Sequence, residues 1–175
     1  MKSLAIALTL VVLSSFAVAQ TPYAGMQTRP VKALSDKDVA DLKAGRGMGL
    51  ALPAELNGYP GPSHVLENAD ALGLTVAQRD RTKALFEAMK AEAVPVGAQL
   101  IEQEARLDLL FAGRQITPAS LTTATVEIGA TQARLRETHL KYHLTMMTVL
   151  NTDQIAKYQT IRGYSSGGGQ HQHRH

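Results

Sequence analysis

The stretch LTTATVEIGATQARLRETHLKYHLTMMTV, residues 121–149, decides the fold predicted for this chain. Along it, one set of side chains recurs at alternating steps of four and three residues, which is the spacing of a single face of a long α-helix. The residues on this stripe are Leu121, Thr125, Ile128, Gln132, Leu135, His139, Tyr142, Met146 and Val149. We expect this face to pack lengthwise against a second helix.

The partner helix is predicted at residues 76–112. Thr75 and Gln78 form a Thr-x-x-Gln pattern, a capping box in which each side chain bonds a backbone N–H at the start of a helix. Leucine, methionine and valine then recur at helical spacing. Pro95 lies inside this segment, where its ring removes one backbone hydrogen bond. We expect a kink at residues 91–95 and not an end of the helix.

The two long helices should form an antiparallel hairpin. Residues 113–115 are a short turn, after which Thr117 caps the next helix and Pro118 occupies its first position. Helices of similar length joined this closely lie side by side. The chain has no alternating β-branched runs, so the predicted class is all-α. A hairpin alone buries little apolar surface, and we therefore expect a dimer.

Short helices are expected on both sides of the hairpin. Ser35 starts one that Gly45 ends, and residues 46–62 are rich in glycine and proline, which indicates a loop. Residues 64–72 read as a second short helix. Asn151, with glutamine three residues later, caps a last one that continues to about residue 162.

The chain begins with the features of a secretory signal peptide at residues 1–19. Lys2 precedes an apolar run at residues 4–13, and Ala-Val-Ala follows at residues 17–19. No later segment reaches the roughly 18 uninterrupted apolar residues of a membrane-spanning helix. We predict an exported, periplasmic protein without a transmembrane segment in the mature chain, comprising an arm (20–62), a hairpin domain (63–164) and a disordered histidine-rich tail (165–175).

Composition limits the chemistry that the chain can perform. Cysteine is absent, which excludes disulfides and thiolate ligands, so any metal must be bound by histidine, methionine or carboxylate. Without the signal peptide, 17 basic residues face 15 acidic ones. This small, evenly spread excess does not indicate nucleic-acid binding. Ser63 next to His64 is not part of a catalytic triad, since no acid is placed to orient the imidazole, and we expect no enzyme activity.

Two motifs at the ends of the hairpin resemble a known family. The segments are LTVAQ at residues 74–78 and LNTDQ at residues 150–154, with the motif residues Leu74, Thr75, Gln78, Leu150, Asn151 and Gln154. They are similar to the paired LTxxQ motifs of the Spy/CpxP family of periplasmic proteins, which includes zinc-resistance-associated and CnrX-like metal-sensor proteins. The second copy has Asn151 where threonine is usual, and asparagine is an equally good cap.

The resemblance implies a role in envelope stress. Members of the family form curved dimers of helical hairpins and have no enzyme activity. They act as ATP-independent chaperones of unfolded envelope proteins or as metal binders, and the sensor branch controls a membrane-bound signalling partner.

His139 and His143 are the first candidate metal ligands. They are four residues apart, so both imidazoles project from one helix face, and Met146 and Met147 lie one turn later. Two imidazoles suit Zn, Cu, Ni or Co, and a thioether such as that of Met147 favours copper. The alternative is that these side chains only pack in the helix seam.

His64 and Glu67 are candidates for the remaining ligands. In an antiparallel hairpin the start of the first long helix lies beside the end of the second, so both side chains can approach His139 and His143. The metal-sensor branch of the family uses histidine and glutamate from this region, so the resemblance implies a similar site. The alternative for His64 is a helix-start residue without a ligand role.

His171, His173 and His175 form a looser metal feature in the tail. Alternate histidines in a flexible chain bind Zn, Ni or Cu weakly, because ordering the chain costs entropy. The alternative is a solvated terminus. The leading hypothesis is thus a periplasmic protein that binds divalent metal and protects the envelope under metal or folding stress. The second hypothesis is a metal-sensor module that regulates a membrane-bound partner.

Overall fold

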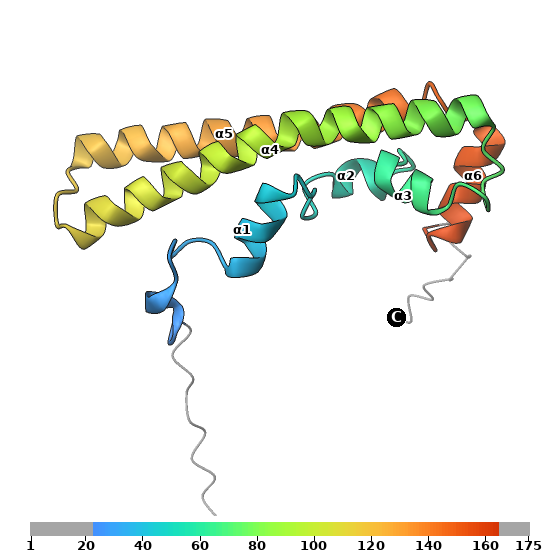
Figure 1. The fold of residues 1–175 in the computed structure, drawn as a ribbon. Coiled ribbons are helices and arrows are strands. Elements are labelled where there is room, and N and C mark those ends of the chain that lie inside the picture. Colours follow the sequence, from blue (N-terminus) through green and yellow to red (C-terminus); the bar gives the residue numbers. More distant parts are fainter. Residues whose placement is uncertain (1–22, 165–175) are drawn as a thin grey trace, which may run out of the picture.

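The computed structural model describes residues 23–164, and this part of the chain is all-helical (Figure 1). The predicted signal peptide and the histidine-rich tail lie outside the described residues. In chain order, the elements are a 3₁₀ turn η1 (Met26–Thr28) and the helices α1 (Asp36–Lys43), α2 (Leu52–Glu55), α3 (Pro62–Glu67), α4 (Val76–Ala112), α5 (Pro118–Met146) and α6 (Thr152–Ile161).

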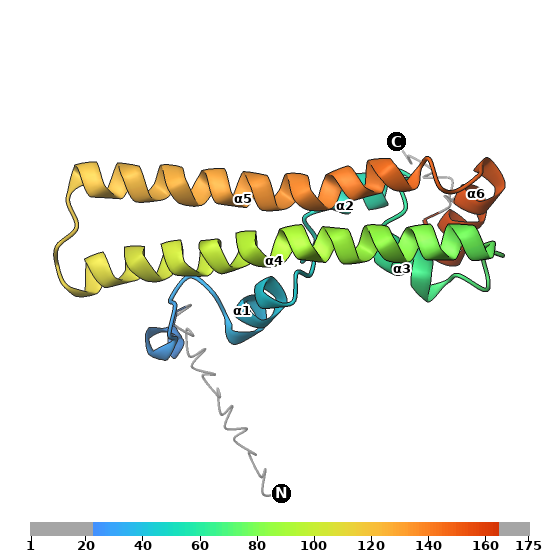
Figure 2. The ribbon, with the colours of Figure 1, turned by 45° about the horizontal axis from the view of Figure 1, so that its top comes forward.

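The predicted helical hairpin is confirmed. α4 and α5 lie side by side along their lengths and are joined by a short turn (Figure 2). Pro95 lies inside α4, which continues through it as one helix, and the ribbon of α4 bends near its middle (Figure 1). A bend without a break is what one missing hydrogen bond produces in a helix supported by its neighbour.

Capping boxes start both α4 and α6, and they also tie the two helices together. The Thr75 and Asn151 side chains accept from the backbone N–H groups of Gln78 and Gln154, respectively. Each glutamine amide then donates to the other glutamine's Oε1, at 2.8 and 3.0 Å, and Gln78 also donates to the carbonyl of Val149. The two motifs, 76 residues apart, therefore form one contact at the base of the hairpin.

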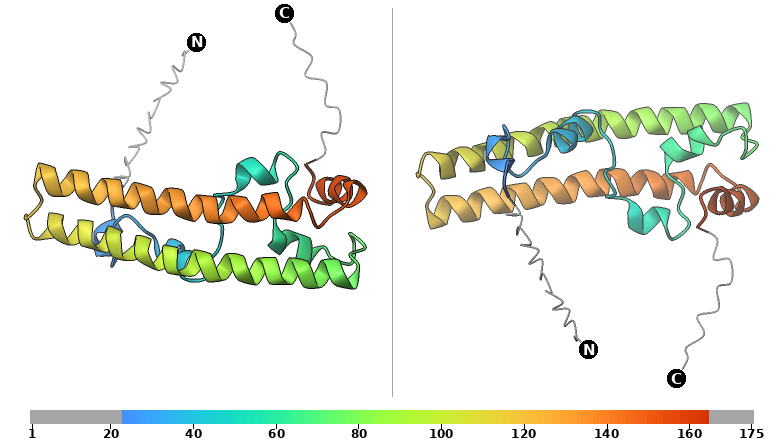
Figure 3. Two further views of the ribbon diagram at one scale, coloured as in Figure 1. Left: turned by 90° about the horizontal axis from the view of Figure 1, so that it is seen from above. Right: turned by 90° about the horizontal axis from the view of Figure 1, so that it is seen from below.

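The arm contains more helix than the sequence predicted, and it wraps one face of the hairpin (Figure 3). α1 packs against α4, α2 packs against α5, and α3 contacts both. The approach of α1 to α4 is closest at Gly97, where an added Cβ would lie 2.7 Å from the carbonyl oxygen of Leu42. α3 begins at Pro62 and ends at Glu67, earlier than expected, and turns lead from it to Gly73.

Two apolar clusters hold the structure together. The first joins α3, the base of the hairpin and α6, and its buried members are Val65, Leu72, Leu85, Met89, Tyr142, Met146, Leu150 and Tyr158. The second lies further along the hairpin under α1 and consists of Leu42, Ala93, Leu100, Ile128 and Leu135. Beyond these clusters, the last buried residue of α4 is Gln103 and the first of α5 is Ile128.

The stripe predicted on α5 is correct from Leu135 onward, whereas among its first four members only Ile128 is buried. Leu121, Thr125 and Gln132 are exposed, whereas His139, Tyr142 and Met146 are buried. His143, expected beside the seam, is also buried because the arm covers it. A periodic pattern identifies a face but not how much of its length a neighbour covers. Among residues 23–164, no helix has both the length and the apolar character required to cross a membrane.

Candidate metal-binding cavity

A cavity of about 640 Å³ lies between the arm and the hairpin. Five ligand candidates were predicted near the hairpin base, and the lining includes four of them, namely His64, Glu67, His139 and His143. α3 supplies the first two and α5 the last two. The antiparallel arrangement therefore brings both pairs to one cavity.

The glycines of the arm lie directly over the two histidines of α5. A Cβ added at Gly47 would be 3.6 Å from Nδ1 of His139, and one added at Gly61 would be 2.7 Å from Cε1 of His143. At position 61, only glycine leaves room for the imidazole in its observed place. The glycine-rich sequence, which indicated a loop, is thus a close-fitting cover over the two rings.

The imidazole of His139 is buried, and one of its ring nitrogens lacks a hydrogen bond. The side chain is 2% exposed, and its Nε2 has no hydrogen-bond partner. Burial, together with the nearby charge of His143, lowers the pKa of His139, which favours the neutral imidazole that binds metals. A buried ring nitrogen without a partner costs free energy unless something else occupies its lone pair.

Glu55, at the end of α2, is a buried carboxylate at the centre of this region. Its Oε1 lies 3.2 Å from Nδ1 of His64 and 3.5 Å from Nε of Arg162, and it accepts from the hydroxyl of Tyr158. Its Oε2 is 3.8 Å from Nδ1 of His143 and has no hydrogen-bond partner. Burial acts to raise the pKa of Glu55, but the bonds from His64 and Tyr158 and the histidine charges outweigh it and lower the pKa to about 2.

The other predicted ligands are placed less favourably. Glu67 is exposed at the edge of the cavity and accepts from the hydroxyl of Ser63 at 3.1 Å. Met147 is the residue after α5 and is not part of the cavity lining, which contains the thioethers of Met48 and Met89. His171, His173 and His175 lie outside the described residues.

No sequence pattern indicated a functional role for Glu55, Tyr59 or Tyr158. The first two lie in the glycine- and proline-rich segment that was read as a loop, and Tyr158 lies in the short last helix. Pro53 in the first turn of α2, followed by a lone glutamate, was the one local signal of an ordered segment. The Tyr158–Glu55 hydrogen bond joins residues 103 positions apart, and the Tyr59–His143 contact joins residues 84 apart, which no local pattern encodes.

The donors around the cavity fit a borderline divalent ion. Three imidazoles, two carboxylates and two thioethers line it, and both His139 Nε2 and Glu55 Oε2 are buried without a hydrogen-bond partner. Within residues 23–164, however, no three histidine, aspartate or glutamate side chains already have a metal-binding geometry. Binding would therefore require side chains around the cavity to turn toward the ion.

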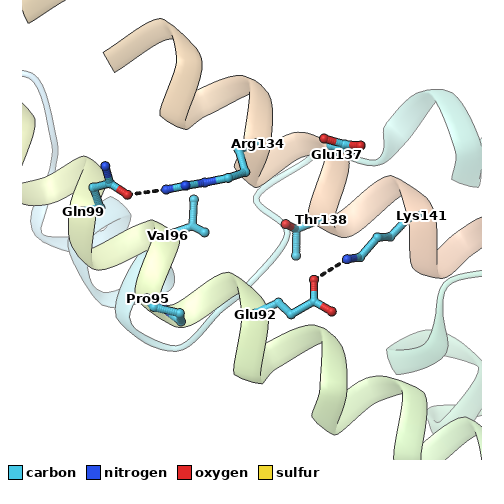
Figure 4. Close-up of a pocket in the computed structure, with 8 residues that line it drawn as sticks. All are labelled: Glu92, Pro95, Val96, Gln99, Arg134, Glu137, Thr138 and Lys141. Carbon is cyan, nitrogen blue, oxygen red and sulfur yellow. Dashed lines mark hydrogen bonds and ion pairs between the residues drawn. The ribbon is translucent and has the colours of Figure 1, made fainter. Parts of the chain in front are cut away.

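A second groove lies on the hairpin itself, between α4 and α5 around Pro95 (Figure 4). Most of its lining residues are polar, and four of them pair with one another: Arg134 donates to Gln99, and Lys141 pairs with Glu92. Such paired, half-exposed charges are typical of a solvated surface. We assign no ligand to this groove.

Comparisons of the chain with protein-family models, with curated proteins and with solved structures find no match.

Proposed function

We propose that this protein is a periplasmic, Spy/CpxP-like helical-hairpin protein that binds a divalent heavy-metal ion and protects the envelope under metal or folding stress. It acts by binding and not by catalysis. The observation that carries the proposal is the convergence of His64, Glu67, His139 and His143, chosen from sequence, on the lining of one cavity. The LTxxQ motifs and the signal-peptide features of residues 1–19 support the family and the location.

The chemistry of the site follows from its donors. Neutral imidazoles bind Zn, Cu, Ni and Co, and the lowered pKa of His139 keeps that ring available near neutral pH. Met48 and Met89 offer a thioether in place of Met147, and a softer ion such as copper would use it. The ion supplies positive charge and a fixed coordination geometry, which link α3 to α5.

Exposed apolar side chains at the far end of the hairpin support a dimer or a surface for unfolded clients. Leu109 and Phe111 on α4 are 68% and 53% exposed, and Val126 on α5 is 65% exposed. Contiguous exposed apolar side chains are typical of interaction sites. The chaperone role and the homodimer rest on this surface and on the family resemblance.

A sensor role is the second candidate, and the arm favours it. Gly47 and Gly61 lie against His139 and His143, so an ion cannot bind these rings without affecting the arm. A metal-dependent change in the arm would alter the surface offered to a membrane-bound signalling partner. The chaperone and sensor roles share the metal site and differ in what the protein binds.

Metal titration of the exported protein tests the proposal. We expect one Zn, Cu or Ni ion to bind tightly per chain, and His139→Ala or His143→Ala to weaken binding at least about tenfold. A chain lacking residues 167–175 separates the hairpin site from the tail and should retain the tight site. If tail deletion abolishes all uptake while the two alanine variants bind normally, the cavity is not the metal site.

Two further measurements separate the proposed roles. Suppression of aggregation of an unfolded client, with and without metal, tests the chaperone role, and failure in both states would contradict it. Sedimentation at micromolar concentration tests the dimer. A metal-dependent change in protease cleavage of the arm without any chaperone effect would favour the sensor role.

A further inference from the structure

We propose that Glu55 is a positioning residue of the metal site, which prepares the imidazoles of His64 and His143 so that each presents an unprotonated Nε2 to the ion. This inference rests on the proposed metal-binding function and assigns to Glu55 a task that Glu67 does not share. Glu55 acts through the histidines and through the arm, and it need not touch the ion.

The contact with His64 fixes the position of a proton. The Glu55 carboxylate receives the Tyr158 hydroxyl and faces the Arg162 guanidinium, and a carboxylate can only accept hydrogen bonds. Because Nδ1 of His64 lies 3.2 Å from Oε1, it is this nitrogen that carries the hydrogen in the neutral ring. The remaining nitrogen, Nε2, therefore bears the lone pair that a metal requires.

His143 is prepared in the same way by the backbone next to Glu55. Its Nδ1 lies 2.7 Å from the carbonyl oxygen of Tyr59, another group that only accepts. Glu55 Oε2, 3.8 Å from the same Nδ1, adds a negative charge that favours a proton there. The backbone N–H of Tyr59 donates to the carbonyl of Ala54, so the acceptor of His143 is held by the turn that follows α2.

Glu55 is itself held in place, which makes it a rigid acceptor. Its side chain is about 6% exposed, and its Oε1 also receives the hydroxyl of Tyr158 and faces Arg162, both from the α6 end of the chain. Histidines that bind metals usually donate their second N–H to a carboxylate or a backbone carbonyl, and this contact fixes the tautomer and the orientation of the ring. In this structure, the acceptor for His64 is the Glu55 carboxylate, and the acceptor for His143 is the Tyr59 backbone carbonyl.

Glu67 provides a matched comparison. It lines the same cavity with the same charge, but its carboxylate accepts from Ser63 and lies at the exposed edge. Replacing either glutamate by glutamine removes one negative charge from the cavity. Only replacement of Glu55 removes the anionic acceptor of His64.

The first experiment measures ring protonation in the metal-free protein by long-range ¹H–¹⁵N correlation NMR. In the unsubstituted protein we expect His64 and His143 to carry hydrogen on Nδ1. In Glu55→Met, which keeps the side-chain volume and removes the acceptor, His64 should shift toward the Nε2–H form. Hydrogen on Nε2 of His64 in the unsubstituted protein, or an unchanged tautomer in Glu55→Met, would overturn the inference.

The second experiment measures Zn affinity by competition with a chromogenic chelator. We expect Glu55→Met to bind about 10–100-fold more weakly and Glu55→Gln to fall between it and the unsubstituted protein. Glu67→Gln removes a proposed ligand, so its control value lies in the NMR experiment, where the His64 tautomer should stay unchanged. Circular dichroism checks that each variant folds, and the NMR result on the unsubstituted protein stands even where Glu55→Met does not fold. Weaker binding without a tautomer change would show a structural role only and would overturn the assignment.

The outcomes also separate this inference from the proposed function. If the unsubstituted protein binds no Zn, Cu or Ni at one ion per chain, the proposed function fails and the inference fails with it. If it binds and both Glu55 variants retain full affinity, only the inference fails. If Glu67→Gln shifts the His64 tautomer as much as Glu55→Met does, the effect is general electrostatics, and Glu55 is not the positioning residue.

Discussion

The two ends of the hairpin differ in what lies against them. At the base, the arm and α6 add a third layer, and Met146 and Val65 are fully buried. At the tip, between the buried residues Gln103 on α4 and Ile128 on α5, no described side chain is buried, and Leu109 is 68% exposed. The same two helices thus behave as a packed domain at one end and as a bare pair at the other.

The difference shows why the functional side chains gather at the base. A two-helix seam has only one layer of side chains, and toward the tip the polar residues that it buries are few, such as Gln103 and Thr131. Where the arm covers α5, the side chains of His139, His143 and Glu55 are buried. Away from water, each of these groups interacts with particular neighbours and not with solvent. The tip has little cover beyond the Lys32–Asp108 ion pair, and apolar side chains such as that of Leu109 remain exposed there.

The largest effect on stability is expected when one apolar side chain is removed from each end of the hairpin in turn. Met146→Ala should lower the free energy of unfolding by about 2–5 kcal/mol, because the fully buried side chain leaves a cavity. Leu109→Ala, at the exposed tip, should change it by less than about 0.5 kcal/mol. Urea unfolding followed by circular dichroism measures both values, and similar losses would mean that the tip is as well packed as the base.

The fit of the arm over the histidines is tested at Gly61. Gly61→Ala places a Cβ 2.7 Å from Cε1 of His143, so the ring must move. We expect Zn affinity to fall about tenfold, which corresponds to about 1.4 kcal/mol. Gly129→Ala is the matched control, since an added Cβ there meets nothing within 4 Å. Equal affinities for the two variants would show that the position of the His143 ring does not matter for binding.

Local rules predicted the hairpin well because its signals lie close together in sequence. The capping boxes at Thr75, Thr117 and Asn151 each need only four residues, and the structure contains all three. The same rules could not reveal that Gln78 bonds to Gln154, because this contact exists only once α4 and α6 meet.

The candidate site was predictable in part. Spacing on one helix and antiparallel pairing were enough to place His64 and Glu67 with the two histidines of α5. Glu55 was missed, since its environment is assembled from α2, α3, α5 and α6 and no element alone indicates it. The burial of the first part of the α5 stripe was overestimated, because periodicity carries no information on where a covering layer ends.

The attachment of the arm further along the hairpin is tested at Gly97. An added Cβ would lie 2.7 Å from the Leu42 carbonyl, a backbone atom that moves only with α1. The gain in helix propensity offsets part of this overpacking, and we expect Gly97→Ala to lose about 1 kcal/mol of stability. Trypsin should also cleave faster near Arg46, because α1 is held less tightly. Gly129→Ala, in contrast, should gain about 0.5–1 kcal/mol.

The smallest effect is expected on the face of the base that the arm leaves open. There, Glu92 pairs with Lys141 (Figure 4). Glu92 also accepts from the hydroxyl of Tyr142 at 2.7 Å. These bonds lower the pKa of Glu92 below its ordinary 4.5, against a smaller opposing effect of burial. The carboxylate therefore stabilises the folded state above pH 4.5, and this contribution is lost as the pH falls through the lowered pKa.

Glu92→Gln isolates this contribution from that of the other carboxylates. The difference in unfolding free energy between Glu92→Gln and the unsubstituted protein should be about 0.2–1 kcal/mol near pH 7, because the pair is nearly half-exposed and screened by water. It should shrink below pH 4.5 and in high salt. A difference that persists unchanged at about pH 3, or one as large as that of Met146→Ala, would mean that this open face is packed as tightly as the face under the arm.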